Sequence, residues 1–236
     1  MRVEWFGQSA FQLSGAGKSV AIDPFGDMSP LSRDRGIQWD YPAIAGVEPD
    51  LLLVTHEHFD HNGVEAIDGE PHTLRSTAGT HDSPVGQVIG VASEHDEKAG
   101  SERGPNTIFC FELDGVRVCH MGDLGQSGLR PEQAEAIGAV DLLFVPVGGG
   151  PTLGAEQAAL IVEACGHAGS CRCTTARRGS AFWRRPTPSW RGRRRCSSSI
   201  SRRSRPIRCA RSRVRSWSCP PRPSVRAGRC GYKQPV

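Results

Sequence analysis

Residues 51–63 carry the clearest structural signal in this chain and read Leu51-Leu52-Leu53-Val54-Thr55-His56-Glu57-His58-Phe59-Asp60-His61-Asn62-Gly63. Four apolar residues in succession are typical of a short strand that is buried on both faces of its sheet. The histidine cluster follows this strand at its C-terminal end, where ligand sites gather in layered α/β folds. The sequence therefore predicts a functional site in the loop directly after a buried strand.

The cluster has the residue types and the spacing of a metal site. His56 and His58 alternate on an extended segment, so their side chains lie on the same side of the chain and can reach one metal ion. Asp60 and His61 lie just past the bend and can turn toward a second ion. Imidazole and carboxylate ligands suit two divalent ions, Zn²⁺ first, with Fe or Mn as alternatives. A solvated polar loop that is rich in histidine by chance is the alternative, and the density of the cluster disfavours it.

The rest of the first 164 residues reads as strands with a few late helices. Expected strands lie at 3–6, 10–13, 19–22, 87–92, 106–113, 116–121 and 141–147. Expected helices lie at 131–137 and 154–164, and residues 26–49 read as a long surface loop. The class is therefore α/β (α+β), with sheets and helices in layers.

Charge divides the chain at residue 164. Residues 1–164 hold nine Lys+Arg and all 25 Asp+Glu, a formal net charge of −16, whereas residues 165–236 hold 20 Lys+Arg and no acid. We treat 1–164 as the body and 165–236 as an Arg/Ser/Pro/Cys-rich tail that is not a true domain. No run approaches the ~20 apolar residues of a membrane helix, and the N-terminus lacks the form of a signal peptide. With two body cysteines that read as buried thiols, we expect a cytoplasmic protein without membrane contact.

Motifs along the body resemble the metallo-β-lactamase-fold hydrolases, in the branch that includes ascorbate-6-phosphate-lactonase-like proteins. The segment from Thr55 to Gly63 is similar to the signature of that family. The other matching segments are Trp5-Phe6-Gly7-Gln8-Ser9, Ile22-Asp23-Pro24-Phe25, Met121-Gly122-Asp123-Leu124-Gly125 and Val145-Pro146-Val147-Gly148-Gly149. The resemblance implies a four-layer αββα sandwich.

The resemblance also implies a ligand set. His56, His58 and a third histidine would bind one ion, Asp60 and His61 the other, and Asp123 would bridge them. His95 matches the position of the third histidine best, and His81 is its rival.

The remaining candidates have smaller roles. Asp23 is placed to orient a ligand histidine by hydrogen bonding, as carboxylates behind metal ligands do. His72 reads as an exposed loop residue and His120 as a packed one.

The implied chemistry is metal-assisted hydrolysis. Two cations lower the pKa of a bound water toward ~7 and polarise the group under attack, with Asp60 as the catalytic residue that orients the water. The substrate class is a small ester, a lactone or a phosphate-bearing molecule, with a nuclease of the same superfamily as an alternative.

The tail lacks the last histidine that the family carries in a Pro-Met-His-Tyr-like segment. Codons can be chosen for residues 170–183 so that the same bases, read one base earlier, encode Val-Pro-Met-His-Tyr-Arg-Thr-Ala-Arg-Ile-Gly-Phe-Leu. GC-rich DNA read out of frame also yields Arg, Pro, Ser, Gly and Cys without acids. The sequence therefore favours a frameshift near Cys165, which makes the C-terminal third aberrant or disordered and its metal site incomplete.

The alternative function belongs to a different class. A catalytically impaired protein could bind nucleic acid non-specifically through a tail of charge +20, in a salt-dependent way. The tail has no zinc-ligand spacing and no repeat, so nucleic acid is the weaker expectation and a small molecule the stronger one.

Overall fold

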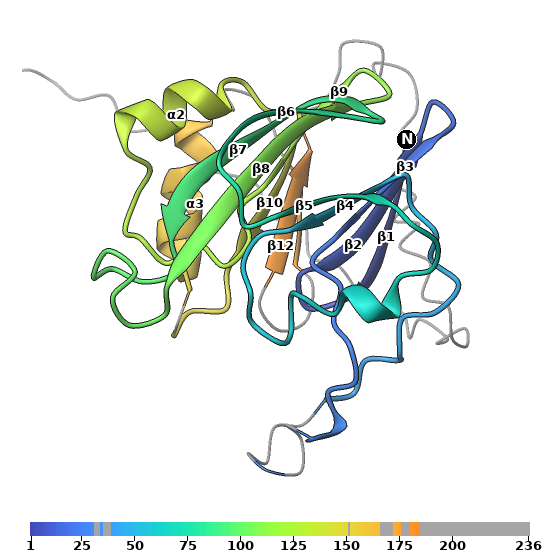
Figure 1. Ribbon diagram of the computed structural model, residues 1–236. Coiled ribbons are helices and arrows are strands. Elements are labelled where there is room, and N and C mark those ends of the chain that lie inside the picture. Colours follow the sequence, from blue (N-terminus) through green and yellow to red (C-terminus); the bar gives the residue numbers. More distant parts are fainter. Residues whose placement is uncertain (31–33, 35–38, 151, 166–171, 176–179, 185–236) are drawn as a thin grey trace, which may run out of the picture. The chain divides into compact units, whose positions relative to one another are not determined.

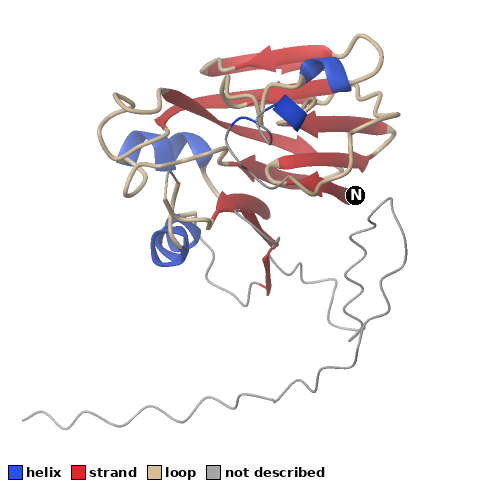
Figure 2. Ribbon diagram, turned by 90° about the horizontal axis from the view of Figure 1, so that it is seen from below, coloured by secondary structure: helices blue, strands red, loops and turns tan. Residues whose placement is uncertain are grey.

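A computed structural model of the chain describes residues 1–30, 34, 39–150, 152–165, 172–175 and 180–184. These residues lie within one compact unit, residues 1–203. Two β-sheets pack face to face, with helices on the far side of the second sheet (Figure 1). Strands make up most of the regular structure (Figure 2).

The first sheet has five strands in chain order. They are β1 (Arg2–Gly7), β2 (Ala10–Gly15), β3 (Lys18–Ile22), β4 (Leu51–Val54) and β5 (His72–Arg75). The first three form an antiparallel meander, and β3, β4 and β5 are parallel to one another.

The second sheet has seven strands. Their order across the sheet is β11 (Arg172–Thr175), β12 (Ser180–Arg184), β10 (Leu142–Pro146), β9 (Val116–His120), β8 (Pro105–Leu113), β7 (Gly86–Glu94) and β6 (Gly79–Ser83). Neighbours are antiparallel except β9 and β10, which run parallel.

Strand β4 is buried on both faces, which explains its unbroken apolar sequence. Leu51 and Leu53 point into the core between the sheets, where they meet side chains of the second sheet such as Phe109. Leu52 and Val54 point to the outer face and join a separate core. Successive side chains of a strand alternate between faces, so only a strand covered on both sides needs apolar residues at every position.

The outer layers complete the predicted αββα sandwich. Helices α2 (Pro131–Ile137) and α3 (Ala155–Ala164) bury their apolar sides against the second sheet. The described residues over the first sheet come from the segment between β3 and β4 and from the 3-10 helix Val64–Ala66. The sequence predicts only a surface loop at residues 26–49, and this is wrong in part, because Met28, Ile44 and Val47 of that segment are themselves buried.

Four strands were not predicted. β5 and β6 are short and polar, so they lack the apolar alternation of a half-buried strand. His72 is exposed as expected, but it lies on β5 rather than in a loop. β11 and β12 lie within the expected tail, and the proposed boundary at 164 stays a prediction.

Residues 166–171, 176–179 and 185–236, to which the expectations of disorder and of nucleic-acid binding mainly apply, lie outside the described residues. Within the described part of the chain, none of the helices has the length and apolar character needed to span a membrane.

Candidate metal centre

The predicted site residues come from the ends of three strands. His56, His58, Asp60 and His61 lie in the turn that follows β4. His95 directly follows β7, and Asp123 lies three residues after β9. The two sheets are tied together here, since the backbone N–H of Thr107 on β8 donates to the carbonyl of Thr55, 2.9 Å away.

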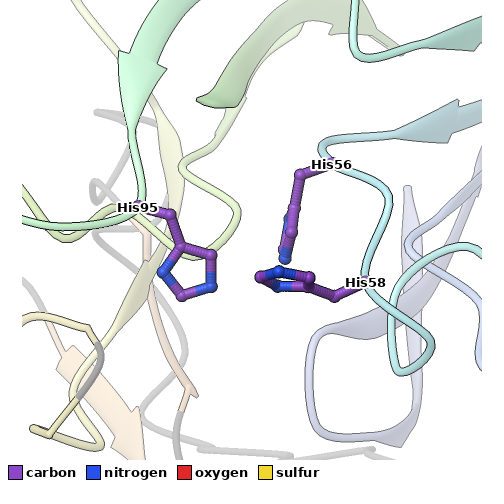
Figure 3. Close-up of side chains that lie close together, drawn as sticks. All are labelled: His56, His58 and His95. Atoms are coloured by element: carbon purple, nitrogen blue, oxygen red, sulfur yellow. The ribbon is translucent and has the colours of Figure 1, made fainter. Parts of the chain in front are cut away.

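Three histidines form the first group of ligand atoms. The rings of His56, His58 and His95 point toward one another (Figure 3), and each offers a nitrogen that lies within 4.8 Å of the others. Their ring centroids are 4.6 to 5.0 Å apart. His81 lies instead on β6, with its Nε2 3.2 Å from the carbonyl oxygen of Ala78. The structure thus brings His95, and not His81, to the other two histidines.

The second group of ligand atoms surrounds Asp123. One Asp123 oxygen, Oδ2, lies 3.4 Å from Nε2 of His61 and 3.3 Å from Nε2 of His95. This group consists of His56, His61 and Asp123, again within 4.8 Å. A carboxylate between the histidines of both groups suits the bridging role that the family resemblance implies.

Asp60 stands at the edge of the second group. Its Oδ2 lies 3.8 Å from Nε2 of His61 and accepts a hydrogen bond from Nε2 of Gln8. The compact second group therefore contains His56 in the place where the sequence led us to expect Asp60.

Buried Asp23 sets the orientation of two histidine rings. Its carboxylate accepts hydrogen bonds from the Thr55 backbone N–H at 2.7 Å, from the Thr55 hydroxyl at 2.8 Å and from Nδ1 of His61 at 3.0 Å. Because the Thr55 hydroxyl hydrogen points to Asp23, its oxygen accepts from Nδ1 of His56, 3.1 Å away. Both histidines therefore carry hydrogen on Nδ1 and present Nε2 to the site.

Those two Nε2 atoms are the feature that most calls for a ligand. In the part of the chain that the structure describes, Nε2 of His56 and Nε2 of His61 are buried without a hydrogen bond of normal geometry, although Nε2 of His61 lies 3.4 Å from the Asp123 carboxylate. A buried polar group left in this state costs about 1–3 kcal/mol. Imidazole nitrogens beside a carboxylate form a donor set that fits a divalent metal ion.

Burial and neighbouring charges set the protonation of these groups. Burial, helped by the positive charge of His61, lowers the pKa of His56 to about 3, and burial also lowers the pKa of His58. Burial would lower the pKa of His61 as well, but the Asp123 and Asp23 carboxylates outweigh it and raise that pKa well above its ordinary value. In turn His61 overcomes the effect of burial and holds the pKa of Asp123 well below its ordinary value. The two carboxylates thus favour the protonated form of His61.

His120 is a packed residue, as expected. Its Nδ1 accepts the backbone N–H of Gly122 at 3.0 Å, so its Nε2 carries hydrogen and donates to the carbonyl of Ser9 at 3.3 Å. Its ring stacks on Phe144, and burial lowers its pKa.

Comparison with known proteins identifies the family. The profile of the family described as the beta-lactamase superfamily domain matches residues 2–165. The chain belongs to the metallo-β-lactamase superfamily. The match ends at the residue where the acidic body gives way to the basic tail.

Relatives in the superfamily agree with this match. A metal-dependent hydrolase from Nitratidesulfovibrio vulgaris is 31% identical over 187 residues, which cover 67% of this chain and 73% of that protein. One from Thermococcus kodakarensis is 28% identical and covers 69% of this chain and 79% of that protein. A solved structure of a candidate Zn-dependent hydrolase of the superfamily from Thermotoga maritima has a TM-score of 0.53 and 31% identity, covering 69% of this chain and 70% of that one.

Sequence reasoning gave no role to Gln8, which contacts a predicted ligand. The residue lies within a segment that resembles the family, but a glutamine in a turn carries no signal of its own. Only the fold brings it to Asp60, 52 positions further along the chain.

Proposed function

We propose that this chain is a metal-dependent hydrolase whose site binds two divalent ions with unequal affinity. The observation that supports it most is the buried Nε2 of His56, which has no hydrogen-bond partner among the described residues, in one group with Nε2 of His61 and the Asp123 carboxylate. Membership of a superfamily in which the relatives are described as metal-dependent hydrolases supports the same reading.

We assign the first ion to His56, His58 and His95 and the second to Asp60 and His61, with Asp123 shared between the two. His56 belongs to both compact groups, but one Nε2 lone pair binds one ion. The first group has only two other ligands, whereas Asp60 is available to the second, so His56 goes to the first. Zn²⁺ is the expected ion, with Mn or Fe as alternatives.

A bound divalent ion would supply hydroxide near neutral pH and polarise the carbonyl or phosphoryl group under attack. The chain's own residues prepare that chemistry. Asp23 holds His61 by its Nδ1 and, through Thr55, holds His56 in the same way, so both rings are oriented before a ligand arrives. Asp60, whose side chain is 31% exposed, reaches the solvent side and would orient the attacking water and carry its proton.

The substrate class that suits such a site is a small ester, a lactone or a phosphate-bearing molecule, which the protein would meet in the cytoplasm. A water nucleophile and a cationic site act on acyl and phosphoryl groups alike. A nuclease of the same superfamily is the closest alternative, and non-specific nucleic-acid binding by the tail is the more distant one.

We also propose that the tail is a wrong-frame translation and that the second ion lacks its last histidine. The end of the family match at residue 165 supports this, because composition changes at the same place. Genomic DNA read across codons 160–185 tests it. An uninterrupted frame without a family-like alternative would contradict the frameshift.

Turnover tests the proposed activity. Purified protein loaded with Zn²⁺ or Mn²⁺ is assayed against aryl esters, lactones and phosphodiesters, beside D123N and the control D82N, whose aspartate is exposed on β6. We expect slow hydrolysis of one class that D123N abolishes and D82N retains. Absence of turnover with all metals, together with salt-sensitive retention on DNA, would favour the binding alternative.

A further inference from the structure

We propose that Gln8 is a positioning residue that holds Asp60 in place for the second metal ion. The inference rests on the proposed function and adds to it a residue that none of the motif reasoning assigned. Gln8 lies in the turn between β1 and β2, in the same sheet as β4, the strand that leads into the histidine cluster.

The contact itself is a hydrogen bond from a neutral donor to the predicted ligand. Nε2 of Gln8 donates to Oδ2 of Asp60. Asp60 is the most exposed of the predicted carboxylate ligands, at 31% against 16% for Asp123. An exposed carboxylate without a partner would sample several rotamers, and each would have to be given up when a metal binds. The amide of Gln8 fixes one rotamer beforehand and adds no charge that would compete with a cation.

The turn that carries Gln8 is held in an unusual conformation. Gly7 has φ +135° and Gln8 has φ +47°, a left-handed value that a residue with a side chain rarely adopts. The indole Nε1–H of Trp5 donates to the Gln8 carbonyl at 2.9 Å. A Cβ at position 7 would collide with the ring of Tyr41, so this ring lies directly on the turn. A glutamine kept at a left-handed position, with its side chain on a predicted ligand, points to a functional constraint rather than to the needs of the turn.

The same turn also contacts the segment that carries the other carboxylate. The carbonyl of Ser9 accepts from His120, and His120 accepts from the backbone N–H of Gly122, next to Asp123. Residues 8 and 9 therefore connect to Asp60 on one side and to the Asp123 loop on the other. Since these carboxylates follow strands of different sheets, the turn fixes their separation across the site.

Metal titration of variants tests the proposal. Q8A should lower the affinity of the second ion by about 10–100-fold and that of the first ion by less than about twofold, because outer partners act on the ligand that they touch. Q12A is the matched control, a glutamine on β2 in the same sheet, and should bind both ions as the unmodified chain does. Cobalt absorption spectra recorded during the titration separate a site of three nitrogens from one rich in oxygen.

Q8G separates positioning from a structural role. Glycine relieves the left-handed strain, so its melting temperature without metal should rise by about 2–4 °C while the second ion is still bound weakly. If the role of Gln8 were purely structural, a variant that raises the melting temperature would also keep or raise the affinity of the second ion. If the unmodified chain takes up a second ion at raised metal concentration and Q8A binds it equally well, the role of Gln8 is wrong and the proposed function stands. If the unmodified chain takes up no second ion at all, the two-ion function fails, and the role of Gln8 fails with it.

Discussion

The two halves of the candidate centre differ in how they exist without metal. The trio of His56, His58 and His95 consists of histidines only, and burial lowers the pKa of His56 and of His58. The second half has opposite charges that already pair, with His61 held between Asp23 and Asp123. A metal ion would meet His56 and His58 rings whose pKa values burial lowers, whereas at the second half it would compete with a proton that the two carboxylates favour on His61.

This difference teaches that proximity of ligand atoms does not fix affinity. Both groups bring their atoms within 4.8 Å. The trio lies wholly within the acidic body, whereas the proposed second site depends on Asp60, which is partly exposed, and lacks the last histidine that the family resemblance implies. We therefore expect the trio to fill first.

The largest expected effect comes from removing a member of the trio. H95A should lower the affinity of the first ion by more than roughly 100-fold, beyond the range that outer partners reach. H81A is the matched control, a histidine on β6 that contacts Ala78. Competition with a chromophoric chelator measures both variants. Equal losses for H95A and H81A would break the distinction between the two positions.

The next effect acts on the orientation of the second group. D23N leaves one carbonyl oxygen to accept from the Thr55 N–H, the Thr55 hydroxyl and His61, so a buried donor loses its partner. We expect the second ion to bind about 10–100-fold more weakly and the free energy of unfolding to fall by about 1–3 kcal/mol. Metal titration and urea unfolding measure these, with D82N as the exposed control. A first ion that weakens more than the second would contradict the assignment.

A smaller effect is expected at the loop behind His95. The Asp96 carboxylate accepts backbone N–H groups of Lys98, Gly100, Glu102 and Arg103, and so holds the loop that follows this ligand. D96A should lower the binding affinity of the first ion by about tenfold and leave the affinity of the second nearly unchanged. E97A is the control, since the neighbouring Glu97 accepts a hydrogen bond from Gln157 and accepts none of the backbone N–H bonds that Asp96 accepts in the described part of the chain. A loss of affinity for the second ion alone in D96A would show that the two metal sites do not bind independently.

The smallest effect is expected at Phe59, between two predicted ligands. Its side chain is 69% exposed, so F59A should change the free energy of unfolding by less than about 0.5 kcal/mol and leave both metal affinities unchanged. Urea unfolding and the same titration check this. A marked loss of metal in F59A would mean that the ring supports the loop of residues 56–61.

The sequence predicts the elements whose residues face apolar surroundings. The run Leu51–Val54 is recognisable because both of its faces are buried, and the helices at α2 and α3 because apolar residues recur on one side. The edge strands β5 and β6 escape prediction, since edge strands can be short and polar.

The site is predictable where ligands are close in sequence and ambiguous where they are not. His56, His58 and His61 are found from spacing alone. The choice between His95 and His81 needs the register of β6 on β7, which pairs His81 with Val88, far from the end of β7 that leads to His95. The contact of Gln8 with Asp60 depends on a strained turn and on two distant segments, and local sequence carries neither.

The metal content of the unmodified chain tests the central claim most directly. Purified protein is equilibrated with buffered zinc over a range of free concentrations, and bound metal is measured per chain. We predict one tightly bound ion, removed by H95A, and a second that binds only at higher free zinc. Two ions of equal high affinity, or no ion at any concentration, would contradict it.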